Sequence, residues 1–309
     1  MSRPLLVKPT LISRGIFSAT ILSGSAVIGV SHFIKHTFLL NFLKSRIELQ
    51  GEDGPIKPTE KLTSIFNDVS NDVKEFVSNH TFMVPFLVPG VRVIHGGTYG
   101  TIQGGIVGLP AFFDFNTKED VEKNVVVNGP SHLNEEELSD MFLLSDEAKK
   151  YVIAREILLI NSMHVYIKTC LPLVVAYSTE MLSKLIARHQ KLTHFPVQVR
   201  AVYYLLVTIV GLMIWNVLSD NFKHYYEADV ESKICKLDSN YMRGGIEYYS
   251  KELKRNQFQV NFKNQTSSLL KTVDDFIVSL LSFKEIPVVR KIAYLKAHLD
   301  LDSKKLAAE

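Results

Sequence analysis

Charged side chains stand inside two stretches of the sequence that are otherwise rich in apolar residues. Arg155 and Glu156 lie in the run AREILLINS, and Glu227 and Asp229 lie in HYYEADVESKICKLD, beyond two long apolar segments. A buried charge is costly unless an opposite charge or a ligand accompanies it. The two stretches flank a membrane-like hairpin, so the two water-facing pieces must meet on one side of a bilayer.

The rest of the sequence shows no motif for nucleophilic catalysis or for phosphate binding. The sequence has no GxSxG elbow, and neither Cys170 nor Cys235 has an evident histidine partner. With Cys170 inside an apolar segment, no disulfide framework is expected. The glycines between positions 96 and 108 match neither a dinucleotide fingerprint nor a Walker pattern, and they predict turns, bulges or close backbone contacts.

The distribution of apolar residues predicts a membrane protein. Of 309 residues 46% are hydrophobic, and they gather into three segments of membrane length. We expect transmembrane helices at 15–36, 164–184 and 199–218, with the last two forming a hairpin inserted into a soluble domain made of 59–162 and 219–309. The predicted fold class is an α+β membrane protein. Its net charge of +3 is small and its basic residues are scattered, so a nucleic-acid partner is not expected, whereas the lipid bilayer is.

Charge asymmetry predicts the topology. The first 47 residues contain basic residues but no acid, and such an Arg-bearing, Ser-containing start resembles a mitochondrial address. The predicted loop 185–198 is also basic, and short basic loops stay on the side where the chain is made. The N-terminus 1–14 and this loop would then face the matrix, with the soluble domain in the intermembrane space. In the alternative, a secretory membrane, the soluble domain would be lumenal and Asn79 and Asn264 would be glycosylation candidates.

Periodicity predicts the elements of the soluble domain. Apolar residues at helical spacing predict a helix over 59–78. Three apolar runs, 82–94, 100–115 and 124–130, predict strands of a small sheet, and prolines at 85 and 89 favour an edge position for the first. Ser145 should cap a helix that continues, with a kink before Pro172, into the second apolar segment. The tail after 264 has a break at Pro287 and no assigned role.

Three segments carry a resemblance to a known family. GLPAFF at 108–113, LSDEAKKYVIAREILLINS at 144–162 and GGIEYYSKELKRN at 244–256, in this order around the apolar segments, resemble the transmembrane protein 177 family of the mitochondrial inner membrane. The likeness covers about 59–256. It implies a multi-pass, non-enzymatic assembly factor for respiratory complex IV. Such a factor would act in the maturation and stabilisation of newly made cytochrome c oxidase subunit II, with that subunit and its membrane-bound assembly chaperone as partners.

A second, more remote resemblance is to membrane zinc peptidases of the heat-shock-protease-X and CAAX-prenyl-protease type. Those enzymes carry HExxH on a helix, then a membrane hairpin, then a helix that supplies a third zinc ligand. The likeness places Glu156 at the general base and Glu227 at the third ligand, within the motif EAD that ends at Asp229. Arg155 and Leu159 stand at the two histidine positions, and neither offers a lone pair.

The resemblance therefore implies an inactive peptidase scaffold, with no catalytic residue, metal or cofactor. Arg155 would then occupy the place of the metal and pair with Glu227 or Asp229 in the domain interior. Such a pair would join the two helices, although desolvation limits its net stabilisation. Two alternatives remain open. A metal site could be rebuilt from His164, His224 and Glu227, or the chain could be an active metallopeptidase-like membrane enzyme by another route.

Polar residues within the predicted hairpin are candidates for partner binding. These residues would prefer protein neighbours to lipid, and packing between the two spans themselves is the competing explanation. They are Tyr177, Glu180, Tyr203, Tyr204 and Asn216.

Overall fold

The computed structural model describes residues 9–52, 54–77, 82–125, 135–266 and 287–306. The chain divides into two compact units. A membrane unit comprises Met1–Ile34 and Met163–Lys223, and a soluble unit comprises Lys35–Ser162 and His224–Glu309. The chain is an α+β membrane protein, because the first unit holds long apolar helices and the second combines helices with a small sheet.

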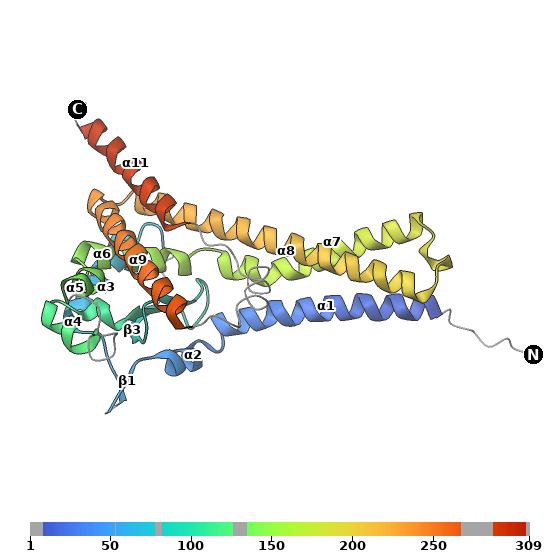
Figure 1. Cartoon of the computed structure of the whole chain (residues 1–309), viewed down its shortest axis with the longest axis horizontal. Helices are drawn as coiled ribbons and strands as arrows, with labels where there is room; N and C mark the ends of the chain where they lie inside the picture. Colours follow the sequence, from blue (N-terminus) through green and yellow to red (C-terminus); the bar gives the residue numbers. More distant parts are fainter. Residues whose placement is uncertain (1–8, 53, 78–81, 126–134, 267–286, 307–309) are drawn as a thin grey trace, which may run out of the picture. The chain divides into compact units, whose positions relative to one another are not determined.

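Among its described residues, the membrane unit is built from three long helices that lie side by side in Figure 1. They are α1 (Pro9–His36), α7 (His164–His189) and α8 (Val197–Ile234), and the last turns of α8 belong to the soluble unit. Each contains a stretch long and apolar enough to cross a membrane. A Cβ at Gly29 would lie 2.4 Å from the carbonyl oxygen of Thr169, so α1 and α7 approach at backbone contact. Small residues allow this kind of packing between helices in lipid.

The helices differ in length from the predicted spans. Helix α7 continues beyond 184 to His189, and α8 begins at Val197 and runs well past 218. The connection is therefore shorter than the predicted loop 185–198, and it contains the 3-10 turn η3 (Leu192–His194). Hydropathy marks the part of a helix that suits lipid, whereas Lys, Arg and Glu extend a helix readily into water.

The soluble unit contains a three-stranded sheet in the order β3-β5-β4. Strand β3 (Met83–Val88) pairs in parallel with the fully buried β5 (Gly105–Pro110), and β4 (Ile94–Gly97) pairs antiparallel with β5. The edge position predicted for the first run is confirmed. A second pairing joins β1 (Gln50–Gly51) to β2 (Gly54–Pro55).

The predicted third strand at 124–130 is wrong where the structure describes it. Asn124 and Val125 end the helix α4 (Lys118–Val125), and 126–130 lie outside the described residues. The run 82–94 instead yields β3 and begins β4 with its last residue. A strand pattern based on apolar side chains does not include the glycines of β4 and β5. They serve close packing, since a Cβ at Gly105 would lie 2.7 Å from the Ile160 side chain.

The helices of the soluble unit pack against the sheet and against one another. Helix α3 begins as predicted, because Thr59 Oγ1 accepts a hydrogen bond from the Leu62 amide, but it ends at Asp72, earlier than expected. Asn79 lies outside the described residues. The remaining elements are α2 (Leu40–Ile47), η1 (Ala111–Asp114), α5 (Glu135–Phe142), α6 (Asp146–Ile160), α9 (Ser239–Thr266) and α11 (Val288–Leu306), which starts directly after Pro287.

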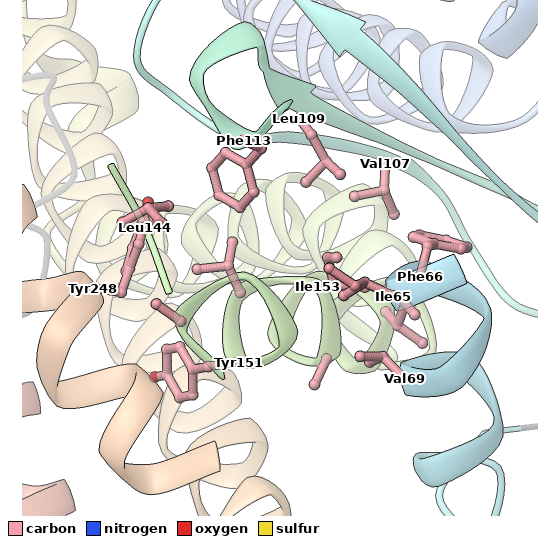
Figure 2. Close-up of a cluster of buried hydrophobic side chains, with 14 of the residues drawn as sticks. Ile65, Phe66, Val69, Val107, Leu109, Phe113, Leu144, Tyr151, Ile153 and Tyr248 are labelled. Carbon is pink, nitrogen blue, oxygen red and sulfur yellow. The ribbon is translucent and has the colours of Figure 1, made fainter. Parts of the chain in front are cut away.

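Helix α6 forms the centre of the core. Figure 2 shows Tyr151 and Ile153 of this helix among side chains from α3, β5 and α9. Ile153 is fully buried, as are Val107 and Leu109 on β5. Each such side chain contributes roughly 1.5–3 kcal/mol by leaving water. Nearly every face of α6 is covered, so its side chains are held in fixed positions.

Helix α6 does not continue into the membrane helix, contrary to the prediction. It ends at Ile160, and α7 starts at His164. Asn161 explains the stop, because its side-chain amide donates a hydrogen bond of 2.7 Å to the Phe76 carbonyl. Pro172, where the kink was expected, lies inside α7.

Candidate functional site

Helix α6 is fixed at its start by a confirmed cap. Ser145 Oγ accepts a hydrogen bond of 3.1 Å from the Ala148 amide and donates one of 2.5 Å to Glu247 on α9. A capping hydroxyl satisfies an amide that the helix leaves unpaired. The cap and this link to α9 set the position of Arg155 and Glu156, which lie further along α6.

Arg155 is the centre of a buried charge cluster. Its Nη1 donates a hydrogen bond of 2.7 Å to Glu156 Oε1. Its Nη2 lies 3.9 Å from Glu227 Oε1, and its Nε lies 3.8 Å from Glu231 Oε1. Burial disfavours the charged guanidinium, but the surrounding negative groups outweigh burial and raise the pKa of Arg155 well above its ordinary value. One cation thus joins α6 to the end of α8.

The two acids predicted as partners differ in their environment. Glu227 contacts Arg155, which confirms that half of the prediction. Asp229 does not, because it accepts a hydrogen bond of 2.7 Å from Lys233 on the same helix, with 41% of its side chain exposed. Two residues of a helix that are two positions apart point to different faces.

Glu156 is 3% exposed and contacts the side chains of Arg155 and His95. Beside its hydrogen bond from Arg155, its Oε2 lies 2.6 Å from His95 Nδ1 on β4. Burial opposes ionisation, but the charges of His95 and Arg155 and the hydrogen bonds from both prevail, so the pKa of Glu156 lies below its ordinary value. This carboxylate therefore links the sheet to the central helix.

Two tyrosines complete the cluster around Glu231. The Tyr151 hydroxyl donates to its carboxylate at 2.6 and 2.7 Å, and the Tyr249 hydroxyl on α9 donates to Oε1 at 2.7 Å. Burial, and with it the negative charge of Glu231, raises the pKa of both hydroxyls well above the ordinary value. Both therefore stay protonated and act as donors at neutral pH.

Helix α11 closes the cluster with Lys291. Its Nζ lies 2.9 Å from Glu227 Oε2 and 5.4 Å from the centroid of the Tyr249 ring. Its side chain is 11% exposed. The sequence tail, to which no role could be assigned, thus supplies a second buried cation.

The donor atoms do not fit a catalytic zinc ion. At the two positions where the peptidase resemblance requires imidazoles, Arg155 is charged and Leu159 is a buried hydrocarbon. Within the described ranges, no three His, Cys, Asp or Glu side chains gather as metal ligands, and His164, His224 and Glu227 form no such group. The cluster instead pairs cations with carboxylates across four elements.

Sequence reasoning missed several members of the cluster. Glu231 follows Glu227 by four positions and so shares its helix face, a spacing that could have identified it. His95 and Lys291 lie far from Arg155 in the chain, and neither carries a pattern that points to the cluster. The hydroxyl roles of Tyr151 and Tyr249 were missed as well.

The hairpin candidates divide into packed and exposed residues. Glu180 is buried, pairs with Lys184 at 2.6 Å and is hydrogen-bonded to Ser18 of α1. Tyr203 donates a hydrogen bond of 2.9 Å to the Ser183 carbonyl. The centroid of the Tyr204 ring lies 4.3 Å from that of the Phe17 ring on α1, and Asn216 is half-buried on α8.

Tyr177 differs from the other hairpin candidates, because it is 62% exposed. Packing between spans therefore explains Glu180, Tyr203 and Tyr204, and Tyr177 is left facing outward.

Comparison with known proteins identifies the family. The model of the family described as Transmembrane protein 177 matches residues 90–284. The chain belongs to the transmembrane protein 177 family. The match includes both charged stretches and the hairpin between them, so the charge cluster lies mostly within the family region, with Lys291 just beyond it.

Over the aligned residues, relatives in this family are about one quarter identical to the chain. The rat protein (Rattus norvegicus) named Transmembrane protein 177 is 27% identical over 215 residues, which are 67% of each chain. The human protein (Homo sapiens) of that name is 26% identical over 214 residues, again 67% of each. For the zebrafish protein (Danio rerio) the identity is 25% over 250 residues, 77% of this chain and 78% of the relative. No solved structure matches this family member, so the likeness to zinc peptidases rests on sequence layout.

Proposed function

We propose that this protein is a non-enzymatic assembly factor for respiratory complex IV. In this proposal it acts in the maturation and stabilisation of newly made cytochrome c oxidase subunit II. It does so beside that subunit and its membrane-bound assembly chaperone, in the mitochondrial inner membrane with the soluble unit in the intermembrane space. Membership of the transmembrane protein 177 family and the acid-free, basic N-terminus support the proposal.

The observation that carries the non-enzymatic part is the position of Arg155. A hydrolytic zinc site needs three lone-pair ligands and an open position for water. Here a guanidinium lies among Glu156, Glu227 and Glu231, within 4 Å of each carboxylate. We infer an inactive peptidase scaffold, in which the cation replaces a metal. The soluble unit and the spans then bind polypeptide without cleaving it.

Partner capture tests the assembly role. The full-length protein carrying a proximity-labelling enzyme would be expressed in mitochondria, with an unrelated three-span inner-membrane protein carrying the same enzyme as control. We expect selective labelling of newly made cytochrome c oxidase subunit II and its chaperone. Equal labelling of these proteins by the control would contradict the proposal.

A pair of substitutions separates a scaffold from an enzyme. In cells lacking the native protein, Arg155→Leu should lower the steady-state level, because three buried carboxylates lose their shared cation. Glu156 also has a structural role through His95, so Glu156→Gln should lower abundance too, but the function per folded molecule should be retained. An enzyme predicts the reverse: normal abundance with lost rescue for Glu156→Gln, beside a harmless Arg155→Leu.

The hairpin can be tested separately as a partner surface. Tyr177 is the candidate whose side chain projects from the packed spans. Replacing Tyr177 by Leu keeps an apolar surface but removes the hydroxyl, and it should weaken copurification with the oxidase subunit if α7 contacts a client helix. Met181→Leu, at another exposed position of α7, is the matched control. Unchanged copurification would assign recognition to the soluble unit.

A further inference from the structure

One corner of the soluble unit exposes large apolar side chains. Phe38 is 72% and Phe82 is 73% exposed, and Ile102, Leu39 and Phe42 are exposed as well. We call these five residues the apolar corner. They come from the turn before α2, from α2 itself, from the start of β3 and from the turn between β4 and β5.

Short contacts hold the apolar corner together. The Gln103 side chain lies 3.5 Å from the Phe38 carbonyl, to which it donates a hydrogen bond. The Gly105 amide donates a hydrogen bond of 2.8 Å to the Phe82 carbonyl. A Cβ at Gly104 would lie 2.0 Å from the same oxygen, and its positive φ also favours glycine. The turn that carries Ile102 is therefore anchored beside both phenylalanines.

The chain brings this corner to a membrane helix by one direct connection. The candidate span on α1 ends at His36, two residues before Phe38. Two residues reach at most about 7 Å. The opposite face of α2 is anchored to the soluble unit, since a Cβ at Gly96 would lie 2.9 Å from the Leu40 side chain. Phe42, on the outward face of α2, therefore stays close to the end of the span.

A second, independent connection reaches the same corner. Helix α6 ends at Ile160, and the span on α7 begins four residues later at His164. The Ile160 side chain packs against Gly105, which follows the turn that carries Ile102. Two separate covalent connections therefore limit how many residues lie between the apolar corner and the ends of two candidate spans.

The chemistry of the corner suits the headgroup region of a bilayer. No acid occurs between positions 37 and 47 or between 98 and 105. The Arg46 guanidinium lies 5.3 Å from the centroid of the Phe42 ring, so a cation borders the apolar surface. Apolar and aromatic side chains flanked by Arg or Lys lie favourably at the boundary between headgroups and acyl chains.

We propose that the apolar corner inserts into the lipid interface, so that the soluble unit rests on the bilayer. This surface goes beyond the assembly role proposed above and does not depend on it. Helix α6 supplies a scale for the test: its first residue, Asp146, lies about 21 Å from Ile160 at the helical rise of about 1.5 Å per residue. Lys61 Nζ pairs with Asp146 at 3.0 Å and so marks the end of α6 remote from the corner.

Fluorescence of the full-length protein in phosphatidylcholine vesicles tests the proposal. Trp215 is the single tryptophan, so Trp215→Phe provides a silent background. Into it, Ile102→Trp places a probe at the corner, and Lys61→Trp provides a matched exposed probe at the far end of α6. Lipids brominated in the upper acyl chain should quench the Ile102→Trp probe several-fold more strongly than the Lys61→Trp probe. Acrylamide in the water should show the opposite order.

Equal quenching of both probes by acrylamide, with no effect of brominated lipid, would overturn the proposal. Thermal unfolding beside the Trp215→Phe parent checks folding, and Phe82→Trp gives a second corner probe that conserves an aromatic residue. Strong acrylamide quenching in vesicles but protection in native membranes would also overturn lipid insertion, and would assign the corner to a protein partner.

Discussion

At the scale of single residues, the buried cluster is a network in which several carboxylates share one cation, rather than a set of separate ion pairs. Arg155 contacts three carboxylates, and its planar guanidinium with five N–H donors suits several acceptors at once. The net stabilisation of such a network is small, because desolvation of the charges opposes their attraction. Removal of one member nevertheless lowers the free energy of unfolding strongly, since the remaining charges stay buried without that partner.

The first prediction concerns Arg155→Leu. We expect the free energy of unfolding to fall by about 3–5 kcal/mol, as for other buried pairs broken from one side. The control Lys233→Leu removes a cation from the partly exposed pair with Asp229 and should cost less than about 1 kcal/mol. Chemical unfolding of both purified variants in detergent measures the difference. Similar losses for the two would mean that the cluster does not stabilise the fold.

The second prediction concerns pH. The folded state lowers the pKa of Glu156 below its ordinary value of 4.5, so its contribution to stability is fully present above that value. As the pH falls through the lowered pKa, the folded state must take up the proton and the contribution is lost. The stability difference between wild type and Glu156→Gln should therefore be constant near neutral pH and shrink below pH 4.5. Unfolding midpoints measured across this range would show it, and a difference that grows in acid would contradict it.

Residue types could reveal the cluster only in part. The likeness to zinc peptidases implies a pairing of Arg155 on α6 with an acid of α8, and the contact between Arg155 and Glu227 confirms it. Lys291 could not be found in this way, because it lies on an amphipathic tail where a lysine is expected on the solvated face. Only the packing of α11 against α9 brings it to Glu227.

At the scale of elements, the contact between α6 and α9 depends on glycine. A Cβ at Gly244 would lie 2.2 Å from the Glu147 carbonyl oxygen, and one at Gly245 would lie 2.6 Å from the Tyr151 ring. The two helices can approach so closely only because these side chains are absent. The pair GG in the segment GGIEYYSKELKRN is thus a packing feature inside a helix.

The third prediction concerns Gly244→Ala. Alanine favours a helix over glycine by roughly 1 kcal/mol, so an unhindered change would stabilise the protein. Here overpacking against backbone should prevail and destabilise it by about 1–3 kcal/mol. Gly24→Ala on α1, where a Cβ would meet no atom within 4 Å, is the matched control and should leave stability unchanged or raised. Thermal unfolding of both variants measures the outcome, and a stabilised Gly244→Ala variant would show that α6 and α9 are not in close contact.

Elements were predictable where local chemistry decides them. The Ser145 cap and the start of α11 directly after Pro287 follow from residues next to the helix ends. Strand β4 was not predictable, because its residues Ile94-His-Gly-Gly97 lack apolar alternation and become a strand only through pairing with β5. The end of α6 at Ile160 depends on a hydrogen bond between Asn161 and Phe76, two residues that are remote from each other in the sequence.

At the scale of the whole molecule, the chain passes between the two units three times, at 34–35, 162–163 and 223–224. Each passage joins the soluble unit to a helix that contains a candidate span. Two of these spans, on α7 and α8, separate the two segments of the soluble unit, Lys35–Ser162 and His224–Glu309, so both segments lie on one face of the membrane. The turn between α7 and α8 must then lie on the other face, and Lys191 in the turn and Arg188 at the end of α7 are consistent with the positive-inside rule.

The last prediction tests this topology with single cysteines. In a background of Cys170→Ser and Cys235→Ala, a cysteine would replace Lys61 or Lys236 in the two soluble segments, or His194 in the turn; all three side chains are exposed. A membrane-impermeant maleimide added to mitoplasts should label Lys61→Cys and Lys236→Cys, because the proposed orientation places both in the intermembrane space. His194→Cys should react only after detergent opens the matrix. Labelling of His194→Cys alone would invert the orientation. Labelling of only one soluble segment would remove a span, because the two crossings between the segments require both to react together.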